Sequence, residues 1–282
     1  MPKGRAVSLL AHDFSLGATA VLVENGLSGG SWVRMAKVRS IFVTDIGSKR
    51  AKNQDSGLAS AERGFCMIAD GMGGHRGGET ASRLAVERQS AVLSESVDPG
   101  QVPELLLEGV RQAHDSIYRL SQEDESLRGM GTTSTVLMLD SPKKPQEAWI
   151  AHVGDSRCYL LKPGAIWQLT RDHSLVQEKL RAGLITREQV RTEAMKNVIT
   201  RSMGFEMQLD ADVYHLDVEK DDVFLLCSDG LTGLVEDPEI LASVEKFRSS
   251  RDWEACARSL IALANERGGD DNISVGILHV GD

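Results

Sequence analysis

The stretch from Phe65 to Ser82 constrains the fold of this chain more than any other. It begins with an apolar run, Phe65–Ala69, which is typical of a buried strand and stops at Asp70. Five glycines follow within eight positions, at 71, 73, 74, 77 and 78, and a helix-like stretch opens at Glu79. Glycine lets the backbone come close to a ligand, because it has no side chain in the way. A carboxylate beside bare backbone suits a hard cation and a phosphate, although a glycine-rich turn would use the same residues.

A nucleotide-binding P-loop is another interpretation of these glycines. Gly73–Thr80 matches G-x-x-x-x-G-K-[ST] at every fixed position except one, where Glu79 replaces the lysine. A negative charge at that position would repel phosphates, so we set the P-loop aside. The rest of the chain must decide between a turn and a metal site.

The composition fits a globular enzyme with a sizeable core, in one large domain or two small ones. The chain has 282 residues, of which 41% are hydrophobic and 26% are charged. Its net charge of −9 argues against nucleic-acid binding, which usually needs a basic surface. An acidic balance is compatible with carboxylates that bound cations neutralise, although most of the acidic residues are expected on the solvated surface.

The four cysteines predict a reduced interior. None belongs to a C-x-x-C pair, so we expect small core residues and neither disulfides nor a zinc site. None has an arginine six positions later, which excludes the C-x5-R arrangement of a thiolate phosphatase. No run reaches 18 apolar residues and the N-terminus is a poor signal peptide, so we predict a cytoplasmic protein that binds no membrane. The cysteines are Cys66, Cys158, Cys227 and Cys256.

A linker-like composition at Gly26–Ser31 and a strand-like run after Met35 divide the chain into an N-terminal extension, 1–34, and a domain, 35–282. Within the domain we expect residues 47–57 to form a polar loop and 172–197 to form a helical flap beside the site, because long excursions between strands are often functional. The strands from 130 to 169 should form an antiparallel meander. The expected strands are 36–44, 65–69, 130–140, 148–153, 157–162, 166–169, 211–218, 223–227 and 273–280, and the expected helices are 79–95, 102–123, 174–182, 187–193, 238–244 and 253–266.

A repeated pattern turns the opening stretch into a candidate metal site. Asp70, Asp155 and Asp229 each follow an apolar strand and each has a glycine next to it, while Asp271 precedes the last strand after two glycines. In an antiparallel sheet, strand ends of opposite direction lie on the same edge, so the four carboxylates can converge. Four like charges would repel strongly unless cations lie among them. Oxygen ligands favour magnesium, manganese or calcium over zinc.

Such a site predicts phosphoester hydrolysis without a covalent intermediate. Two adjacent divalent ions can bridge a water and lower its pKa, so that a hydroxide attacks phosphorus while the metals neutralise the phosphoryl oxygens. In the polar loop, Arg50 can hold a phosphate through two parallel hydrogen bonds, and Asp55 can support a metal.

The order and wording of the motifs resemble the metal-dependent serine/threonine protein phosphatases, the PPM or type-2C family, in their bacterial form. The resemblance runs from about Ala36 to the C-terminus. It is carried by TDIGSKRAKNQDS (44–56), ADGMGGHRGGETAS (69–82), GMGTT (129–133), HVGDSR (152–157), LTRDHS (169–174), VITRSMG (198–204), LLCSDGL (225–231) and GGDDNISV (268–275). Together these motifs are highly specific, whereas any one alone would not be.

The resemblance implies an α+β fold, a four-layer α-β-β-α sandwich with two stacked antiparallel sheets flanked by helices. It implies a phosphoric monoester hydrolase, a protein serine/threonine phosphatase that uses Mn²⁺ or Mg²⁺ and a metal-bridging hydroxide. Its substrates would be phosphorylated Ser/Thr proteins, among them a Ser/Thr kinase and that kinase's targets. We expect a monomer, because no heptad run or large apolar helix face is left over.

The resemblance also implies a role for each site residue. Asp70 would bridge two core ions, with the Gly71 carbonyl as a further ligand, and Asp229 and Asp271 would complete the second site. Asp155 would bind a third, weaker ion near the flap. Asp55 would act through a metal-bound water, and Arg50 would hold the substrate phosphate.

One position departs from the eukaryotic members, which carry a histidine immediately after the Asp-Gly pair as the proposed general acid. Met72 occupies that position here, as is usual in bacterial members. His75 lies nearby, and a metal-bound water is the other candidate for the acid. Two rival functions remain: a catalytically silent relative that binds phosphoproteins, which the sequence disfavours because every expected metal carboxylate is present, and a hydrolase of small phosphoesters.

Overall fold

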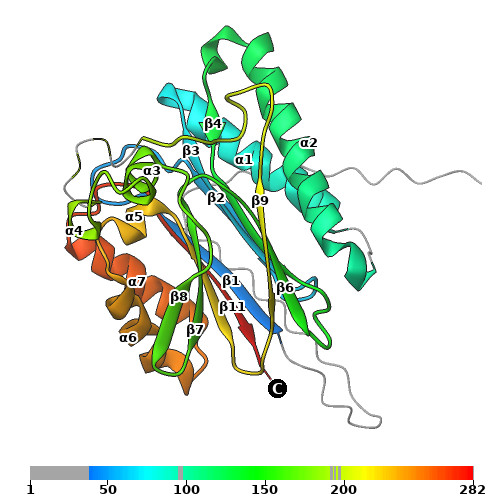
Figure 1. Cartoon of the computed structure of the whole chain (residues 1–282), viewed down its shortest axis with the longest axis vertical. Helices are drawn as coiled ribbons and strands as arrows, with labels where there is room; N and C mark the ends of the chain where they lie inside the picture. Colours follow the sequence, from blue (N-terminus) through cyan, green and yellow to red (C-terminus); the bar gives the residue numbers. More distant parts are fainter. Residues whose placement is uncertain (1–37, 95–97, 191–192, 194, 196–197, 282) are drawn as a thin grey trace, which may run out of the picture.

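The computed structural model describes residues 38–94, 98–190, 193, 195 and 198–281, shown in Figure 1. The side chains of residues 74–76 and 187 are also outside the described part. The predicted N-terminal extension, 1–34, therefore lies outside the described residues. Among the described helices, none is long and apolar enough to cross a membrane.

Two antiparallel sheets form the centre of the molecule. Sheet A has the strand order β1 (Val38–Asp45), β11 (Ile273–Val280), β10 (Val223–Cys227), β7 (Arg157–Lys162) and β8 (Ala165–Gln168). Sheet B has the order β2 (Asp55–Ser60), β3 (Phe65–Met72), β5 (Ser134–Leu139), β6 (Glu147–Val153) and β9 (Asp212–Asp217), and β4 (Gly131–Thr132) adds to β3.

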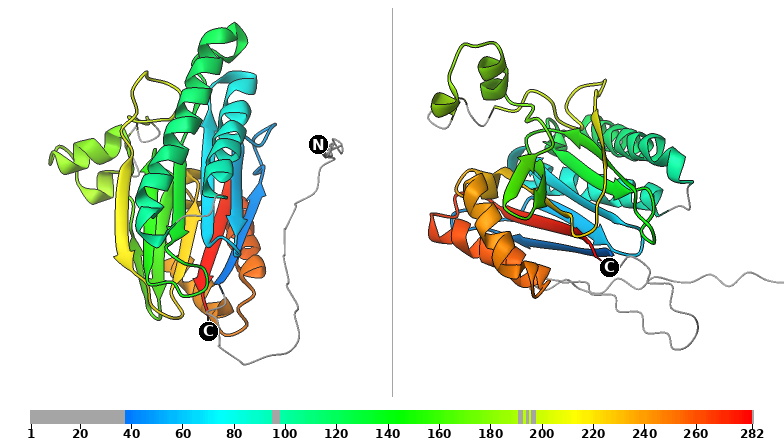
Figure 2. Two further views of the ribbon diagram at one scale, coloured as in Figure 1. Left: turned by 90° about the vertical axis from the view of Figure 1, so that its right-hand side faces the viewer. Right: turned by 60° about the horizontal axis from the view of Figure 1, so that its bottom comes forward.

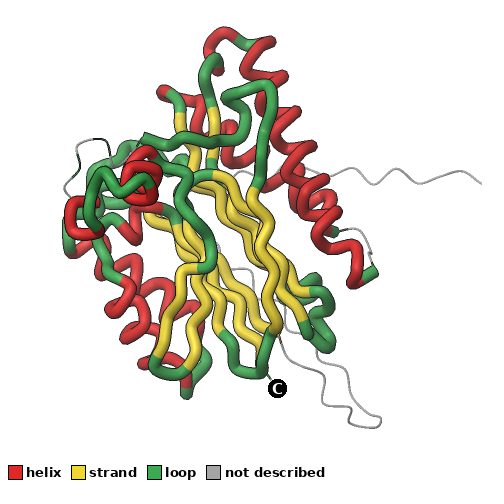
Figure 3. The backbone as a smooth tube through the Cα atoms, viewed as in Figure 1, coloured by secondary structure: helices red, strands yellow, loops and turns green. Residues whose placement is uncertain are grey.

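Two helix pairs cover the outer faces of the sheets, as Figures 2 and 3 show. The α1 (Gly74–Leu93) and α2 (Val102–Glu123) pair packs on sheet B, and the α6 (Asp237–Arg248) and α7 (Trp253–Glu266) pair packs on sheet A. A third apolar core fills the space between the sheets. The predicted four-layer α+β sandwich is confirmed.

Burial explains why the central strands read as unbroken apolar runs. Every residue of β10 and β11 is buried, because one face of each strand meets helices and the other meets sheet B. The edge strand β9 instead alternates between partly buried and exposed residues. The four cysteines are buried and free, as the sequence indicated.

Short helices complete the chain. The helices α3 (Leu175–Arg181) and α4 (Arg187–Val190) stand off the sandwich, and α5 (Asp229–Thr232) follows β10 directly. Two 3₁₀ turns, η1 (Pro99–Gln101) and η2 (Glu125–Leu127), flank α2.

Four local predictions were wrong. β3 continues through Asp70 to Met72, because Gly71 and Met72 pair with β4. The helix expected from Glu79 begins at Gly74, so Glu79 lies in its second turn. Part of the expected loop 47–57 is strand β2, because Asp55–Gly57 pairs with β3.

The predicted meander is the fourth error. The chain makes two hairpins, β5–β6 in sheet B and β7–β8 in sheet A, and it crosses between the sheets at residues 154–156. Gly154 has a positive φ of 107° at this crossing, which glycine adopts readily.

Candidate functional site

Two threonines hold the backbone of Asp70 at the end of β3. The Asp70 N–H donates to Thr133 Oγ1 at 2.8 Å. Its carbonyl accepts from Thr132 Oγ1 and from the Thr133 N–H, both also at 2.8 Å. These three bonds fix the direction in which the Asp70 carboxylate leaves the strand.

The glycines allow helix α1 to begin directly on this strand end. A Cβ on Gly71 would overlap the carbonyl groups of Gly78 and Gln54, so only glycine fits there. The Gly71 N–H donates to the Gln54 carbonyl at 3.1 Å. The glycine-rich stretch therefore brings backbone against backbone beside Asp70, as expected for a site that a ligand approaches closely.

Asp55 lies opposite Asp70 in the register of β2 and β3. Its Oδ2 accepts hydrogen bonds from Ser228 Oγ at 2.8 Å and Ser274 Oγ at 2.6 Å. Its Oδ1 is buried without a hydrogen-bond partner. Burial raises the pKa of Asp55 to about 7, against the lowering effect of the two serines, and repulsion from Asp229 and Asp271 adds to the rise.

Asp229 and Asp155 bring two more carboxylates to the same end of the sandwich. Asp229 is the first residue of α5, and Asp155 lies in the crossing between β6 and β7. Each has a buried Oδ1 without a hydrogen-bond partner. Burial is the main cause that raises the pKa of both carboxyl groups, and repulsion from Asp271 and Asp229, respectively, adds to it.

The carboxyl cluster thus comprises five aspartates that repel one another: Asp55, Asp70, Asp155, Asp229 and Asp271. Asp70 lies at its centre, since burial and then all four of the others raise the pKa of its carboxyl group. Asp271 precedes β11 of sheet A, which runs antiparallel to β1 and β10, whereas Asp70 lies on β3 of sheet B. The carboxylates therefore converge at one end of the sandwich from two sheets, and not at the edge of a single sheet as predicted.

The residues of this cluster fit hard divalent cations. Buried polar atoms nearly always have a partner, yet Asp55, Asp155 and Asp229 each leave one oxygen unpaired. A set of carboxylate oxygens is what Mg²⁺ and Mn²⁺ prefer, and bound cations would offset both the desolvation and the mutual repulsion.

Arg50 reaches the cluster from the loop between β1 and β2. Its Nη2 donates to Asp271 Oδ2 at 2.6 Å, and about half of its side chain remains exposed. Asn272 holds this loop: its amide donates to the carbonyls of Ile46 and Lys52, both at 2.9 Å, and its Oδ1 accepts from the Gln54 N–H at 2.8 Å.

A cavity of about 260 Å³ lies between the cluster and the flap. In its wall, Arg157 forms a bidentate pair with Asp172, with Nε to Oδ1 at 3.0 Å and Nη2 to Oδ2 at 2.6 Å. The lining residues come from the crossing and β7, from the flap and from α5: Asp155, Arg157, Asp172, Ser174, Val176, Gln177, Val190, Asp229, Thr232 and Gly233.

Sequence reasoning found the carboxylates but missed the groups that hold them. Thr133, Ser228, Ser274 and Asn272 all lie within motifs that carry the family resemblance, yet none received a role. The sequence feature that could have identified them is their position next to an aspartate or close to one on a neighbouring strand. Met72 ends β3 and is partly buried. His75 lies in the first turn of α1, and its side chain is outside the described residues.

Comparison with known proteins agrees with this geometry. The model of the family described as "Protein phosphatase 2C" matches residues 34–273. "Serine/threonine phosphatase stp" of Listeria monocytogenes serotype 4b is 36% identical over 240 residues, which cover 83% of this chain and 92% of that protein. "Protein phosphatase PhpP" of Streptococcus pneumoniae is 38% identical over 242 residues, with 84% and 95% covered.

Solved structures give the same result. The serine/threonine phosphatase PstP/Ppp of Mycobacterium tuberculosis superposes with a TM-score of 0.79 at 31% identity, covering 87% of this chain and 99% of that one. The catalytic domain of PstP in complex with two manganese ions has a TM-score of 0.77 at 31% identity, with 88% and 100% covered.

Proposed function

This chain belongs to the protein phosphatase 2C family and is a metal-dependent serine/threonine protein phosphatase, and on that premise we propose the role of each site residue. Asp70, the Gly71 carbonyl, Asp229 and Asp271 hold two core ions. Asp155 binds a third ion, beside the cavity under the flap. The phosphatase domain is 35–282, with 172–197 as its flap.

The unpaired buried oxygens carry this proposal. Asp229 Oδ1 and Asp155 Oδ1 have no hydrogen-bond partner, although both are buried. Manganese is the preferred candidate metal, because the related PstP structure contains two manganese ions. When bound, two such ions supply a hydroxide nucleophile and charge neutralisation for the phosphoryl oxygens.

Arg50 is proposed to bind the substrate phosphate. Its guanidinium can form two parallel hydrogen bonds to phosphate oxygens, and Asn272 fixes the loop that presents it. Arg50 now pairs with Asp271. If the Asp271 carboxylate turned to bind a cation, the Arg50 guanidinium would become available to the substrate phosphate.

Asp55 is proposed to orient the attacking water. The two serine hydroxyls occupy Oδ2 and hold the carboxyl group in one direction. Oδ1 is then the acceptor left for a water in the site. At the leaving-group side, the Met72 side chain has no proton to give, so we propose that water protonates the departing serine or threonine alkoxide.

We place the protein in the cytoplasm, as a monomer acting on a Ser/Thr kinase and that kinase's targets. Four buried free thiols support a reducing compartment.

The deciding experiment compares wild type with Asp229→Ala. We expect wild type to dephosphorylate a phosphothreonine peptide in preference to small phosphoesters, with turnover that requires manganese and stops with a chelator. Asp229→Ala should be inactive while keeping its circular dichroism spectrum. Turnover in Asp229→Ala would contradict the ligand assignment, and preference for the small phosphoesters would contradict the proposed substrate class.

A further inference from the structure

A single residue of the flap, His173, binds both backbone polar groups of Gly154, which directly precedes Asp155 in its turn. The Gly154 N–H donates to His173 Nδ1 at 3.1 Å, and the His173 N–H donates back to the Gly154 carbonyl at 2.8 Å. A Cβ on Gly154 would clash with Thr133, so the turn is also packed tightly from the other side. The position of Asp155 therefore depends on His173.

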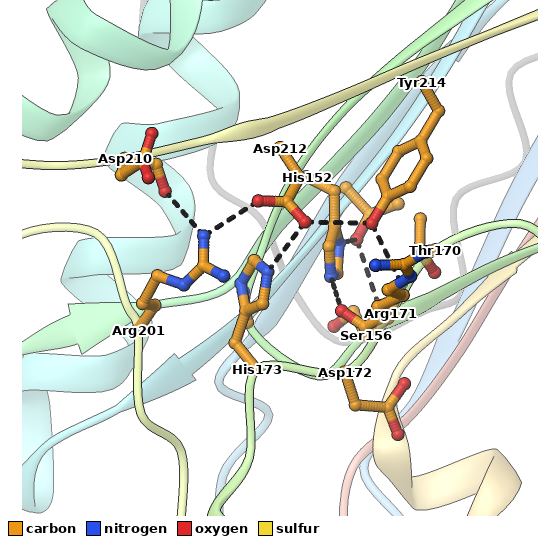
Figure 4. Close-up of polar contacts among 12 residues, drawn as sticks. His152, Ser156, Thr170, Arg171, Asp172, His173, Arg201, Asp210, Asp212 and Tyr214 are labelled. Carbon is orange, nitrogen blue, oxygen red and sulfur yellow. Dashed lines mark hydrogen bonds and ion pairs between the residues drawn. The ribbon is translucent and has the colours of Figure 1, made fainter. Parts of the chain in front are cut away.

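These contacts fix the tautomer of His173. Because Nδ1 accepts a hydrogen bond, the neutral ring carries its proton on Nε2, which lies 3.3 Å from Asp212 Oδ2 (Figure 4). The side chain is only 4% exposed. Burial, followed by the nearby Arg201, lowers the pKa of the imidazole, in keeping with a neutral ring.

Asp212 is in turn held from three directions. Arg201 Nη1 donates to its Oδ1 at 2.8 Å, and Tyr214 OH donates to its Oδ2 at 3.0 Å. The Tyr214 hydroxyl also accepts from the Arg171 N–H at 3.2 Å. Figure 4 shows these side chains gathered around His173 and the neighbouring ring of His152, whose centroid is 4.8 Å away.

His173 also lies at the neck of the flap, which we define as His173–Ser174 and Ile199–Thr200. The Thr200 N–H donates to the His173 carbonyl at 2.8 Å, and Ser174 forms an isolated β-bridge with Ile199. The two ends of the flap thus close on the residue that holds Gly154. Ser174 and Asp155 line the same cavity.

We propose that His173 is a positioning residue that ties the Asp155 turn to the neck of the flap, so that metal affinity at Asp155 depends on the acceptor at His173 Nδ1. The proposal rests on the assignment of Asp155 as a metal ligand. It adds a residue that touches neither metal nor substrate and acts only through the Gly154 backbone. Loss of a residue that orients a metal ligand without touching the metal typically changes metal affinity by about 10- to 100-fold.

Two variants, each of which replaces the imidazole by an amide near one of its ring nitrogens, separate positioning from simple loss of packing. The side-chain oxygen of His173→Asn can reach the place of Nδ1 and accept from the Gly154 N–H. His173→Gln places its amide near Nε2 and keeps only the contact with Asp212. Manganese would be titrated by calorimetry into the chelator-treated full-length protein, with Asp155→Asn identifying the binding event that belongs to Asp155.

We expect His173→Gln to weaken that binding event by about 10-fold or more, and His173→Asn to weaken it by less than about threefold. The other manganese ions should bind as in wild type, and the two variants should unfold at similar temperatures. Equal weakening in both variants, or none in either, would overturn the role of His173. If Asp155→Asn itself bound manganese like wild type, the ligand assignment would fail, and the inference with it.

Discussion

Aspartates lie both in the carboxyl cluster and beside the neck of the flap, but the fold gives their carboxylates different partners. Asp172 and Asp212 near the neck each meet an arginine within the chain. Burial alone would raise the pKa of Asp212, but the contacts with Arg201, His173 and Tyr214 lower it to about 2. In the cluster, burial raises the pKa of Asp55 to about 7.

The difference shows which carboxylates are structural and which await a ligand. Near the neck, the chain supplies its own cations, so the charges are balanced without metal. Two guanidinium groups lie near the five carboxylates of the cluster: Arg50, bonded to Asp271, and Arg157, which is paired with Asp172 outside the cluster. Three of the five carboxylates keep an unpaired buried oxygen. An excess of buried negative charge destabilises the metal-free protein and favours cation binding.

The largest expected effect comes from Asp229→Asn, which keeps the shape of the side chain and removes its charge. Activity should fall on the order of 10³-fold. This loss is well beyond the roughly 10- to 100-fold loss that follows removal of a residue that only supports a metal ligand. The chelated variant should nevertheless unfold at a temperature equal to or above that of wild type, because one repulsive charge is gone. Phosphatase assays and thermal unfolding with a chelator measure both. A chelated variant much less stable than chelated wild type would contradict the claim that repulsion within the cluster destabilises the metal-free protein.

Arg50→Ala should have the next largest effect. Loss of a charge-assisted bond to phosphate costs about 1.5–3 kcal/mol, so kcat/KM for a phosphopeptide should fall by roughly 10- to 150-fold. Stability should barely change, since the partly exposed pair with Asp271 contributes at most about 1 kcal/mol. Steady-state kinetics and chemical denaturation test this. An unchanged kcat/KM would contradict the proposal that Arg50 binds the substrate phosphate.

Ser274→Ala should lower activity by about tenfold, which is the lower end of the effect expected for a residue that supports a site carboxylate without touching the metal. The variant removes the shorter of the two hydrogen bonds to Asp55 Oδ2, at 2.6 Å. As a matched control, Ser259→Ala removes a serine on α7 that bonds only the Cys256 carbonyl in the same helix. Equal loss of activity in both variants would show that Asp55 needs no support from Ser274.

The two regions should also respond to pH in opposite directions. The pKa of Asp55 is raised in the folded state, so its contribution to stability is present below about pH 4 and is lost as the pH rises through 7. The pKa of Asp212 is lowered to about 2, so its contribution is present above about pH 4 and is lost toward pH 2. The combined contribution of these two carboxyl groups to stability is therefore greatest near pH 4.

Thermal unfolding from pH 3 to 8, with chelator and with manganese, measures this. Manganese should raise the unfolding temperature most at pH 8, where the cluster is ionised and repulsion is greatest. Asp55→Asn removes this titration, so a difference in stability between the chelated wild type and Asp55→Asn that stays constant from pH 4 to 8 would contradict the pKa assigned to Asp55.

Sequence patterns predicted the elements that burial determines. The bounds of α2, β7, β10, α7 and β11 all agree with the structure, because their apolar periodicity reports directly on packing. β2 was missed because its sequence, DSGLAS, has few residues typical of strands, and its pairing with β3 is decided by tertiary contacts. Gly57 sits there because a Cβ would clash with the ring of Phe42.

The same distinction holds at the site. Asp70, Asp155 and Asp229 could be found because each follows an apolar run and has a glycine next to it, and Asp271 because it follows two glycines and precedes an apolar strand. Their supporting residues were missed although Ser228 and Asn272 lie next to an aspartate, because only the topology shows which carboxylate each one holds: Ser228 lies 2.8 Å from Asp55. His173 likewise gained a role only when the fold brought it to Gly154.

Calorimetric titration of manganese into the chelated wild type, Asp229→Asn and Asp212→Asn tests most directly whether the cluster, and not the aspartates beside the neck, holds the core metals. We predict that Asp229→Asn loses tight manganese binding, whereas Asp212→Asn keeps it and unfolds at a lower temperature. Tight binding retained in Asp229→Asn, or lost in a folded Asp212→Asn, would contradict the account.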